Sequence, residues 1–560
     1  MTNSFIYKND RPWPNPRLKR AAIVGHVTAE TAKLWFRTAA PGNYEVWIYA
    51  TSADPADVLF GGFKAVPYTG KAALPDYVGC IPLVVPDYAS DSTAVAEIEN
   101  LEPETEYRYA LFGTEDGKER ILLGQDQPYR FRTLPAASAT DAPLSFAFYS
   151  CHMPYALTLF GKTEVSGMAM WDCLNEVMER HYAKDFRFLL AGGDQVYVDG
   201  VTSLDIWKYL NGAMSRAGGQ LGPTQDEMAS WYRDIYRGYW GFPSVRQAFG
   251  RFPTYMIWDD HELADGWGSL RLAGGKDDEL DERFPERKAK GLSRADCLEL
   301  LARMEQAAKQ VYTEYQHSHN PDTPDGQYDY AIDCGSTAVY VLDGRGNRDI
   351  NRAETRILGK AQMKRFTDWL DALDPAATKY LFVVAAVPVL HMKPVFANAD
   401  DNVLADLANL QDDLRDSWEH ALHDKERRQL LKALFRTAAR GIKVSILSGD
   451  VHISAVFRMT DAQTGATIYQ LTSSALTYNK PRFLGWVLGN TVPDEGESDD
   501  GYHFKRLALY TDCNFGLVTV DPQKDEVTFQ LYGMQKVSHP DGKAEDRPVT
   551  HSIAKFELSF

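Results

Sequence analysis

Short apolar runs that end abruptly in polar or acidic residues recur through most of the chain. The run FRFLLAGG (186–193) is followed at once by Asp194, and Tyr197 and Asp199 come shortly after it. An apolar run of this length bounded by glycine is typical of a strand covered on both faces, as in α/β sheets. Such sheets carry their chemistry just beyond the carboxyl ends of the strands. The pattern therefore predicts a buried strand that presents acidic groups at one sheet edge.

The same pattern occurs at four further places. An acidic residue after a single strand is more often a helix cap or a turn residue than a ligand, so one occurrence is weak evidence. Five strand ends that all carry metal-ligand side chains would be an improbable coincidence, and we expect them to form one shared site. The further runs are 144–150 before Cys151 and His152, 253–258 before Asp259, Asp260, His261 and Glu262, 380–390 before His391, and 443–449 before Asp450 and His452.

Residues 21–133 follow a different pattern, in which short β-type runs are separated by turn residues with no long helical period between them. This spacing is typical of a small antiparallel sandwich. The stretch LEPETEYRYAL (101–111) resembles the corner of fibronectin type III domains, where a tyrosine, here Tyr107, closes the turn before a late strand. Trp35 and Trp47 are expected in its core. This part of the chain carries no obvious chemistry.

A linker pattern marks the end of the first domain. Residues 134–143 are small, polar and bounded by prolines. Beyond them strands alternate with helical periodicities, which is the signature of a layered α/β domain. We therefore predict an all-β domain over residues 1–137 and an α/β domain over residues 138–560. The expected helices cover residues 164–183, 296–316, 360–373 and 416–440.

One long segment of the second domain lacks periodicity. Residues 268–294 are rich in charges and punctuated by glycines, which most simply predicts a solvated loop. The alternative is a lid that closes over the shared site. The acidic stretch 493–503 is expected on the surface, and the end of the chain contains two runs, NFGLVTVD and EVTFQLYG, that predict a hairpin.

Composition narrows the classes of function. The chain has 560 residues and a formal net charge of -17, which argues against an extended nucleic-acid or anionic-membrane footprint. An acidic protein can still bind phosphate if metal ions reverse the local field. The six cysteines form no CxxC pair, so neither a zinc ribbon nor a disulfide scaffold is indicated. No apolar run is long enough for a membrane span, and the polar N-terminus lacks a signal-peptide core, so we expect a cytoplasmic protein.

The residues at the strand ends combine carboxylates and imidazoles with one thiol and one phenol. Carboxylate oxygens suit hard cations such as calcium, magnesium or manganese, whereas a phenolate and a thiolate favour a strongly Lewis-acidic iron. Two adjacent cations can clamp a phosphoryl group, lower the pKa of a bound water and neutralise the negative charge of an ester. Hydrolysis of phosphate esters therefore fits this donor set best.

Four ordered motifs carry a resemblance to a known family. YSCH, GGDQVYVDG, WDDHELADGWGS and SGDVHISAVF together resemble the PhoD-type alkaline phosphatases, a branch of the calcineurin-like metallophosphoesterases. The resemblance implies an α/β fold in which a four-layer α/β/β/α metallophosphoesterase domain follows a fibronectin type III-like sandwich. It also implies a metal-dependent phosphoric ester hydrolase, acting as a phosphomonoesterase or phosphodiesterase on small-molecule phosphate esters. In such enzymes a metal-activated hydroxide attacks phosphorus in line.

The resemblance also implies a set of metal ligands. Asp194 would bridge two cations, and Cys151 and Tyr197 would be the thiolate and phenolate ligands of iron. The family pattern therefore implies Fe³⁺ beside Ca²⁺, with Mn²⁺, Mg²⁺ or Zn²⁺ as alternatives. The six implied ligands are Cys151, Asp194, Tyr197, Asp260, Asp450 and His452.

This chain departs from the wider superfamily at two of these motifs. Asp260 stands where the superfamily carries an asparagine, and Asp450 with His452 stands where it carries two histidines. Both changes add oxygen ligands, which is consistent with calcium beside iron. Asp260 and His261 are the implied catalytic residues. His261 would contact the phosphoryl group or protonate the leaving oxygen.

Several neighbouring residues keep two interpretations. Arg345 is either a phosphate-binding residue or part of an internal salt bridge with Asp343. Asp259 and Asp199 are either ligands or residues that orient ligands. His152 and His391 match no motif of the family and are more simply structural.

Two other functions are compatible with the sequence, and one feature common in the family does not occur in it. The chain could be a non-catalytic, metal-stabilised binding protein whose β-sandwich recognises a partner. It could also be a metallohydrolase that acts on a different bond. PhoD-type enzymes are often exported by a twin-arginine signal, which makes a secreted or periplasmic location the alternative, but no such motif occurs here.

Overall fold

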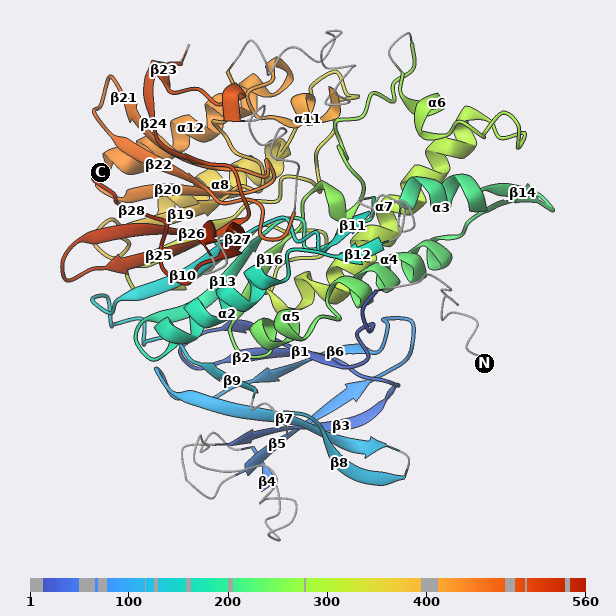
Figure 1. The fold of residues 1–560 in the computed structure, drawn as a ribbon, viewed down its shortest axis with the longest axis horizontal. Helices are drawn as coiled ribbons and strands as arrows, with labels where there is room; N and C mark the ends of the chain where they lie inside the picture. Colours follow the sequence, from blue (N-terminus) through green and yellow to red (C-terminus); the bar gives the residue numbers. More distant parts are fainter. Residues whose placement is uncertain are drawn as a thin grey trace.

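A computed structural model gives the fold of this chain (Figure 1). It describes residues 14–49, 66–68, 78–115, 117–124, 129–157, 163–199, 205–275, 278–393, 411–478, 489–498, 501–538 and 544–560. The fold is mixed α/β, as expected, and it is built around two large sheets that bring distant parts of the sequence together. In the described part of the chain, no helix is both long and apolar enough to cross a membrane.

The N-terminal part forms two sheets that share one core. Alternate residues of β1 and β2 point in opposite directions, so Val24 and Leu34 pack against the larger sheet while Ile23 and Trp35 pack against the rest of the molecule. The smaller sheet is therefore buried on both faces. Its order is β1 (Ala21–Val27), β2 (Ala32–Arg37), β6 (Thr93–Ile98), and the larger sheet is β4 (Val66–Pro67), β5 (Val78–Val85), β3 (Gly42–Tyr49), β7 (Glu106–Glu115), β8 (Lys118–Leu123), with β9 (Tyr129–Arg132) beside β7.

A seven-stranded sheet carries the first three of the predicted strand ends. Its strands β10, β13 and β16 run parallel, so their carboxyl ends meet at one edge. The predicted C-terminal hairpin is confirmed, since β25 and β26 pair antiparallel and extend this sheet. The order is β16 (Thr254–Ile257), β13 (Phe186–Gly192), β10 (Leu144–Tyr149), β25 (Asn514–Asp521), β26 (Glu526–Ser538), β27 (Ala544–Pro548), with β28 (Ala554–Glu557) also beside β26.

An eight-stranded sheet carries the remaining strand ends. Its central strands β18, β19, β20 and β22 run parallel. Phe146 of the seven-stranded sheet and Phe382 of the eight-stranded sheet pack edge to face, with their ring centroids 5.1 Å apart. They lie in a core that both sheets share. The order is β17 (Tyr330–Cys334), β18 (Thr337–Val341), β19 (Tyr380–Val384), β20 (Lys443–Ser448), β22 (Thr467–Thr472), β21 (Ser454–Asp461), β24 (Tyr502–Tyr510), β23 (Glu495–Glu497).

Helices cover these two sheets. α2 packs on β13, whereas α8 and α12 pack on the eight-stranded sheet through a second, separate core (Figure 1). The helices are α2 (Ala169–Tyr182), α3 (Ile206–Ala213), α4 (Gln225–Tyr239), α5 (Pro243–Phe249), α6 (Leu280–Arg283), α7 (Arg294–Tyr315), α8 (Gly359–Ala372), α11 (Gln411–Asp416) and α12 (Asp424–Ala439), with 3₁₀ turns η1 (Asp260–Glu262), η2 (His317–His319) and η3 (Ala421–His423). Two small hairpins are β11 (Tyr155–Leu157) with β12 (Thr163–Val165), and β14 (Ser215–Ala217) with β15 (Gln220–Gly222).

The predicted helices are confirmed in part. α7 and α8 match their predicted ranges within two residues, and α2 begins at Ala169 because the residues before it form β12. The prediction of one helix over 416–440 is wrong, since α11 ends at Asp416 and α12 begins at Asp424. Buried polar contacts explain the break: Asp416 forms ion pairs with Arg345, and Glu419 accepts the backbone N–H of His391 at 2.8 Å.

The charged segment 268–294 contains little regular structure besides α6, and residues 276–277 lie outside the described part of the chain. Internal ion pairs hold it, with Asp278 bound by Arg294 and Glu279 by the buried Arg415. The alternative of a lid over the site stays untested, as does the predicted domain boundary at residue 137.

Candidate functional site

The ends of four parallel strands bring the candidate residues together. Cys151 follows β10, Asp194 follows β13, Asp260 follows β16, and Asp450 follows β20 of the other sheet. Because the strands run parallel within each sheet and the two sheets pack together, side chains more than 250 residues apart in sequence share one site. The expected convergence of strand ends is thus found, with the exception of the β19 end.

The backbone at this site adopts an uncommon conformation. Cys151, Asp194, Asp450 and His452 have φ angles of +57°, +58°, +63° and +54°. Non-glycine residues rarely occupy this left-handed region, and where they do the surrounding structure must hold them there. Backbone hydrogen bonds provide that support, since the N–H of Cys151 donates to the carbonyl of Gly193 and that of His152 to the carbonyl of Asp194. Such conformations cluster at functional sites.

The first group of donors combines a thiol, a carboxylate, a phenol and an imidazole. The Cys151 Sγ and the Tyr197 hydroxyl each lie 3.2 Å from Asp194 Oδ2, and the Tyr197 hydroxyl lies 3.0 Å from His452 Nε2. Burial, with the nearby Asp194, raises the pKa values of Cys151 and Tyr197 well above their usual ranges. A bound cation of high charge would displace these protons, because a thiolate or a phenolate is the coordinating form.

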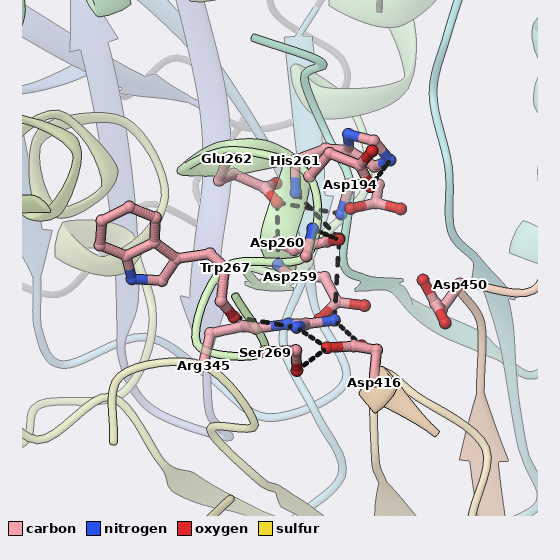
Figure 2. A network of polar contacts seen from close by, with 12 residues as sticks. Asp194, Asp259, Asp260, His261, Glu262, Trp267, Ser269, Arg345, Asp416 and Asp450 are labelled. Carbon is pink, nitrogen blue, oxygen red and sulfur yellow. Dashed lines mark hydrogen bonds and ion pairs between the residues drawn. The ribbon is translucent and has the colours of Figure 1, made fainter. Parts of the chain in front are cut away.

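The second group of donors consists of carboxylates. Oxygens of Asp194, Asp259, Asp260 and Asp450 lie within 4.8 Å of one another (Figure 2). Burial and mutual repulsion raise the pKa of Asp194 well above its usual range and that of Asp259 to about 6. Asp194 Oδ1 and Asp259 Oδ2 are buried and have no hydrogen-bond partner among the described residues. Buried oxygens of this kind are costly unless a cation or a donor satisfies them, so the group fits a hard cation.

His261 lies beside both groups and is held by Asp199. Its Nδ1 is 2.7 Å from Asp199 Oδ1, and its ring stacks on the Tyr197 ring with centroids 4.0 Å apart. Burial disfavours the charged imidazolium, but Asp199, Asp260 and Asp194 outweigh it and raise the pKa of His261 well above its usual value. Asp199 therefore orients His261 and stabilises its protonated form.

Asp260 is held from two sides by backbone donors. Its Oδ1 accepts the N–H of His261 at 3.0 Å, and its Oδ2 accepts the N–H of Gly266 at 2.8 Å. These bonds fix the carboxylate while it remains within reach of Asp194 and Asp450. Hydrogen bonds of this kind hold the oxygens of a metal-binding carboxylate in a fixed orientation.

Arg345 lies beneath the carboxylates in an internal network rather than at the surface. It is 1% exposed, and its guanidinium binds Asp416 through two hydrogen bonds of 2.6 and 2.5 Å and pairs with Asp259 (Figure 2). Of the two sequence interpretations, these contacts favour the internal salt bridge. The partner differs from the expected Asp343, whose carboxylate instead accepts the backbone N–H of Arg345 at 3.0 Å.

Three residues support the site in roles that the sequence did not predict. Glu262 accepts the backbone N–H groups of Asp194, Gln195 and Asp259 at 3.1, 2.7 and 2.8 Å, and thereby ties two strand ends together. The role of Asp416 was missed because this residue was assigned to the first position of the predicted helix 416–440. Ser474, whose Oγ lies 3.1 Å from Cys151 Sγ, follows the apolar strand β22, and the same strand-end pattern would have found it.

Two candidate histidines lie apart from these donor groups. His152 is buried, with its Nδ1 3.1 Å from the Trp171 indole N–H and its Nε2 3.2 Å from the Tyr239 carbonyl. His391 is 3% exposed and belongs to none of the ligand groups formed by the described residues. Burial lowers the pKa of each to about 3, so both remain neutral. This agrees with their structural interpretation.

Comparisons with known proteins identify the fold and the family of this chain. An uncharacterised protein of Saccharomyces cerevisiae is 23% identical over 407 residues, which cover 63% of this chain; the chain spans 54% of the length of that relative. The solved structure of PhoD matches with a TM-score of 0.59 at 14% identity, covering 98% of this chain and 93% of that chain. A purple acid phosphatase from yellow lupin (Lupinus luteus) seeds matches with a TM-score of 0.51 at 11% identity, covering 98% and 75%.

These two structures share the fold of this chain. At such low sequence identities the likeness shows the fold and nothing about activity. The family model is more specific, because it covers the strand ends that supply the site. The model of the PhoD-like phosphatases matches residues 147–531, from within β10 to within β26. The chain therefore belongs to the family of PhoD-like phosphatases.

Proposed function

We propose that this protein hydrolyses phosphate esters of small molecules at a site with two cations. The observation that carries the proposal is the position of Asp194, whose carboxylate belongs both to the thiol–phenol–imidazole group and to the carboxylate group. A carboxylate shared by two donor groups is what a bridging ligand of two adjacent cations requires.

The two donor groups differ in the cations they suit. Cys151, Asp194, Tyr197 and His452 would hold Fe³⁺, because thiolate and phenolate favour a strongly Lewis-acidic ion. Asp194, Asp260 and Asp450 would hold Ca²⁺, because they offer only oxygen. Mn²⁺, Mg²⁺ or Zn²⁺ are the alternatives at either position.

The cations would supply charge neutralisation and a lowered pKa for an attacking water. The chain itself supplies the positioning and the proton. His261, protonated through its contact with Asp199, is placed to bind a phosphoryl oxygen or to give a proton to the leaving group. Glu262 and the backbone donors to Asp260 hold the carboxylates in place.

The proposal also covers the organisation of the chain into two domains. We infer that residues 138–560 form an α/β/β/α metallophosphoesterase domain and that residues 1–137 form a fibronectin type III-like sandwich. Supporting observations are the separate cores on either side of the eight-stranded sheet and the Tyr107 hydroxyl, which accepts the N–H of Glu102 at 2.8 Å as a corner tyrosine would.

An assay on two chromogenic esters tests the function. Protein purified with its metals should hydrolyse p-nitrophenyl phosphate, bis(p-nitrophenyl) phosphate or both, and Asp194→Asn should lower kcat by at least 100-fold, because it weakens both cation positions. A carboxylic ester, p-nitrophenyl acetate, detects hydrolysis of a different bond. A metal-loaded protein that cleaves neither phosphate ester would favour the rival, a metal-stabilised binding protein.

A further inference from the structure

A cleft separate from the candidate active site runs between α8 and α12. It has a volume of about 1090 Å³, and residues of the loop that precedes α8 also line it. Both helices pack on the eight-stranded sheet through the second core (Figure 1). Lining residues such as Lys364 and Arg436 are exposed, so the cleft opens on the surface of the molecule. Neither the proposed hydrolysis nor its metal ligands use any residue that lines it.

The walls of the cleft carry matching rows of polar and charged side chains. α8 contributes positions 360, 364, 367 and 371, and α12 contributes positions 425, 429, 432 and 436. Both series advance by four, three and four residues, so each row lies along one helix face. At 1.5 Å per residue the rows are about 16 Å long. The floor between them includes the apolar Leu358, Met363 and Ala433, all largely buried.

The charge of this surface is opposite to that of the whole chain. Seven basic and three acidic residues line the cleft, whereas the complete chain has 60 basic and 77 acidic residues. One of the three acids is bound by backbone donors, since Glu426 accepts the N–H groups of Ile357, Leu358 and Gly359 at the start of α8. This capping also occupies the positive end of the helix.

The basic residues of the cleft differ in whether they have an acidic partner. Glu354 lies 2.7 Å from Lys360 and also contacts Lys425, and Asp371 lies 2.6 Å from Arg436. Acids just outside the lining pair with two more cations, Asp349 with Arg352 at 2.6 Å and Asp368 with Lys364 at 2.5 Å. Arg356 and Lys432 have no acidic partner within 4 Å in the described part of the chain. Arg356 Nε is buried and has no hydrogen-bond partner there. Among the described residues, two of the seven cations are therefore without an acidic partner, one on the loop before α8 and one on α12.

We propose that this cleft docks an acidic amphipathic helix of a partner protein. The two rows together carry five basic residues and one acidic residue. With the apolar floor between them, they are complementary to a helix that has acidic flanks and an apolar face. A polyphosphate chain or a nucleic acid fits less well, because it has no apolar groups for Leu358 and Met363 and would approach Glu354 and Asp371.

Peptide binding tests the proposal directly. The probe is a fluorescently labelled 21-residue peptide with leucines on one helix face and glutamates beside them, measured by anisotropy with the full-length, metal-loaded protein. We expect saturable binding that weakens as salt rises, and at least a tenfold loss of affinity in the double variant Arg356→Glu and Lys432→Glu. Hydrolysis of the chromogenic esters should not change, because both residues lie outside the candidate active site.

Matched controls decide between docking and general charge attraction. The double variant Lys118→Glu and Lys536→Glu makes the same charge change at exposed residues outside the cleft and should bind like the wild type. A peptide of the same composition with dispersed leucines should bind at least tenfold more weakly, as should inorganic polyphosphate. The proposal is overturned if the wild type does not bind the amphipathic peptide, if both double variants lose equal affinity, or if either control ligand binds equally well.

Discussion

Gly193 has a backbone conformation that few other residues could adopt in its place. Its φ is +110°, and a Cβ built at this position would lie 2.7 Å from the Cβ of Asp259. The missing side chain is what allows the loop after β13 to approach the loop after β16. Because Asp194 follows directly, the spacing of the carboxylate group depends on this contact.

Gly193→Ala is therefore expected to disturb both the fold and the metal site. The left-handed conformation and the clash should lower the free energy of unfolding by about 1–3 kcal/mol, and the content of oxygen-bound cation should fall. Chemical denaturation and elemental analysis measure the two effects. Gly212→Ala is the control, because a Cβ there would meet nothing within 4 Å; equal losses in both variants would contradict the explanation.

Arg345 gives a second expectation at the scale of a residue. Arg345→Gln leaves Asp259 and Asp416 buried without their cation, and breaking such a buried pair typically costs about 3–5 kcal/mol. Arg345→Lys keeps the charge but cannot bind both oxygens of Asp416 and also reach Asp259, so an intermediate loss is expected. Urea denaturation of the two variants checks this order. A wild-type stability for Arg345→Gln would show that the network is not needed.

The sequence could reveal ligands but not the residues that support them. Asp194, Asp260 and Asp450 follow apolar runs, which is a local pattern, and the structure brings all three together. The supporting roles of Glu262 and Asp416 depend on contacts between separate loops. Arg345 had two compatible roles in the sequence, and only burial distinguishes them.

Periodicity in the sequence predicts helices whose packing is local. It fails where a buried polar contact interrupts the helix. α7 has a regular apolar face and begins with a Ser293–Asp296 capping box, and its predicted range is nearly right. The range 416–440 has helical periodicity throughout, yet it breaks between α11 and α12 because Asp416 and Glu419 make buried contacts with other loops. No local pattern carries that information.

Contacts between the N-terminal sheets and the rest of the molecule include a group of neutral histidines. His26 lies in β1, and His317 and His319 form part of η2 after α7. Burial lowers the pKa of His26 and of His317 to about 4 and that of His319 to about 3, with Lys33 adding to the effect. Tyr255 contacts His26 at 3.2 Å. Protonation of these histidines would therefore destabilise the contact between the N-terminal sheets and the rest of the molecule.

The sign of the resulting pH dependence follows from these shifts. The unfolded chain binds protons at these histidines near pH 6.5, whereas the folded chain does so only near pH 3–4. Their stabilising contribution is thus complete above about pH 6.5 and is lost as the pH falls toward 4. Thermal unfolding from pH 7 to pH 5 should show a smaller decrease in Tm for His319→Gln than for the wild type.

The exposed His551 offers a control for this measurement. His551→Gln should retain the wild-type pH dependence, because its ring is exposed and belongs to no buried contact. A decrease in Tm that is identical for the wild type and His319→Gln would contradict the assignment of the effect to the buried histidines.

The whole molecule serves to hold two sheets so that Cys151, Asp194, Tyr197 and His452 meet. The most direct test is the visible spectrum of the iron-loaded protein together with its metal content. We expect two cations per chain, one of them iron, and a phenolate-to-iron charge-transfer band that Tyr197→Phe abolishes. Iron that binds without such a band, or a band that persists in Tyr197→Phe, would contradict a metal centre formed by these strand ends.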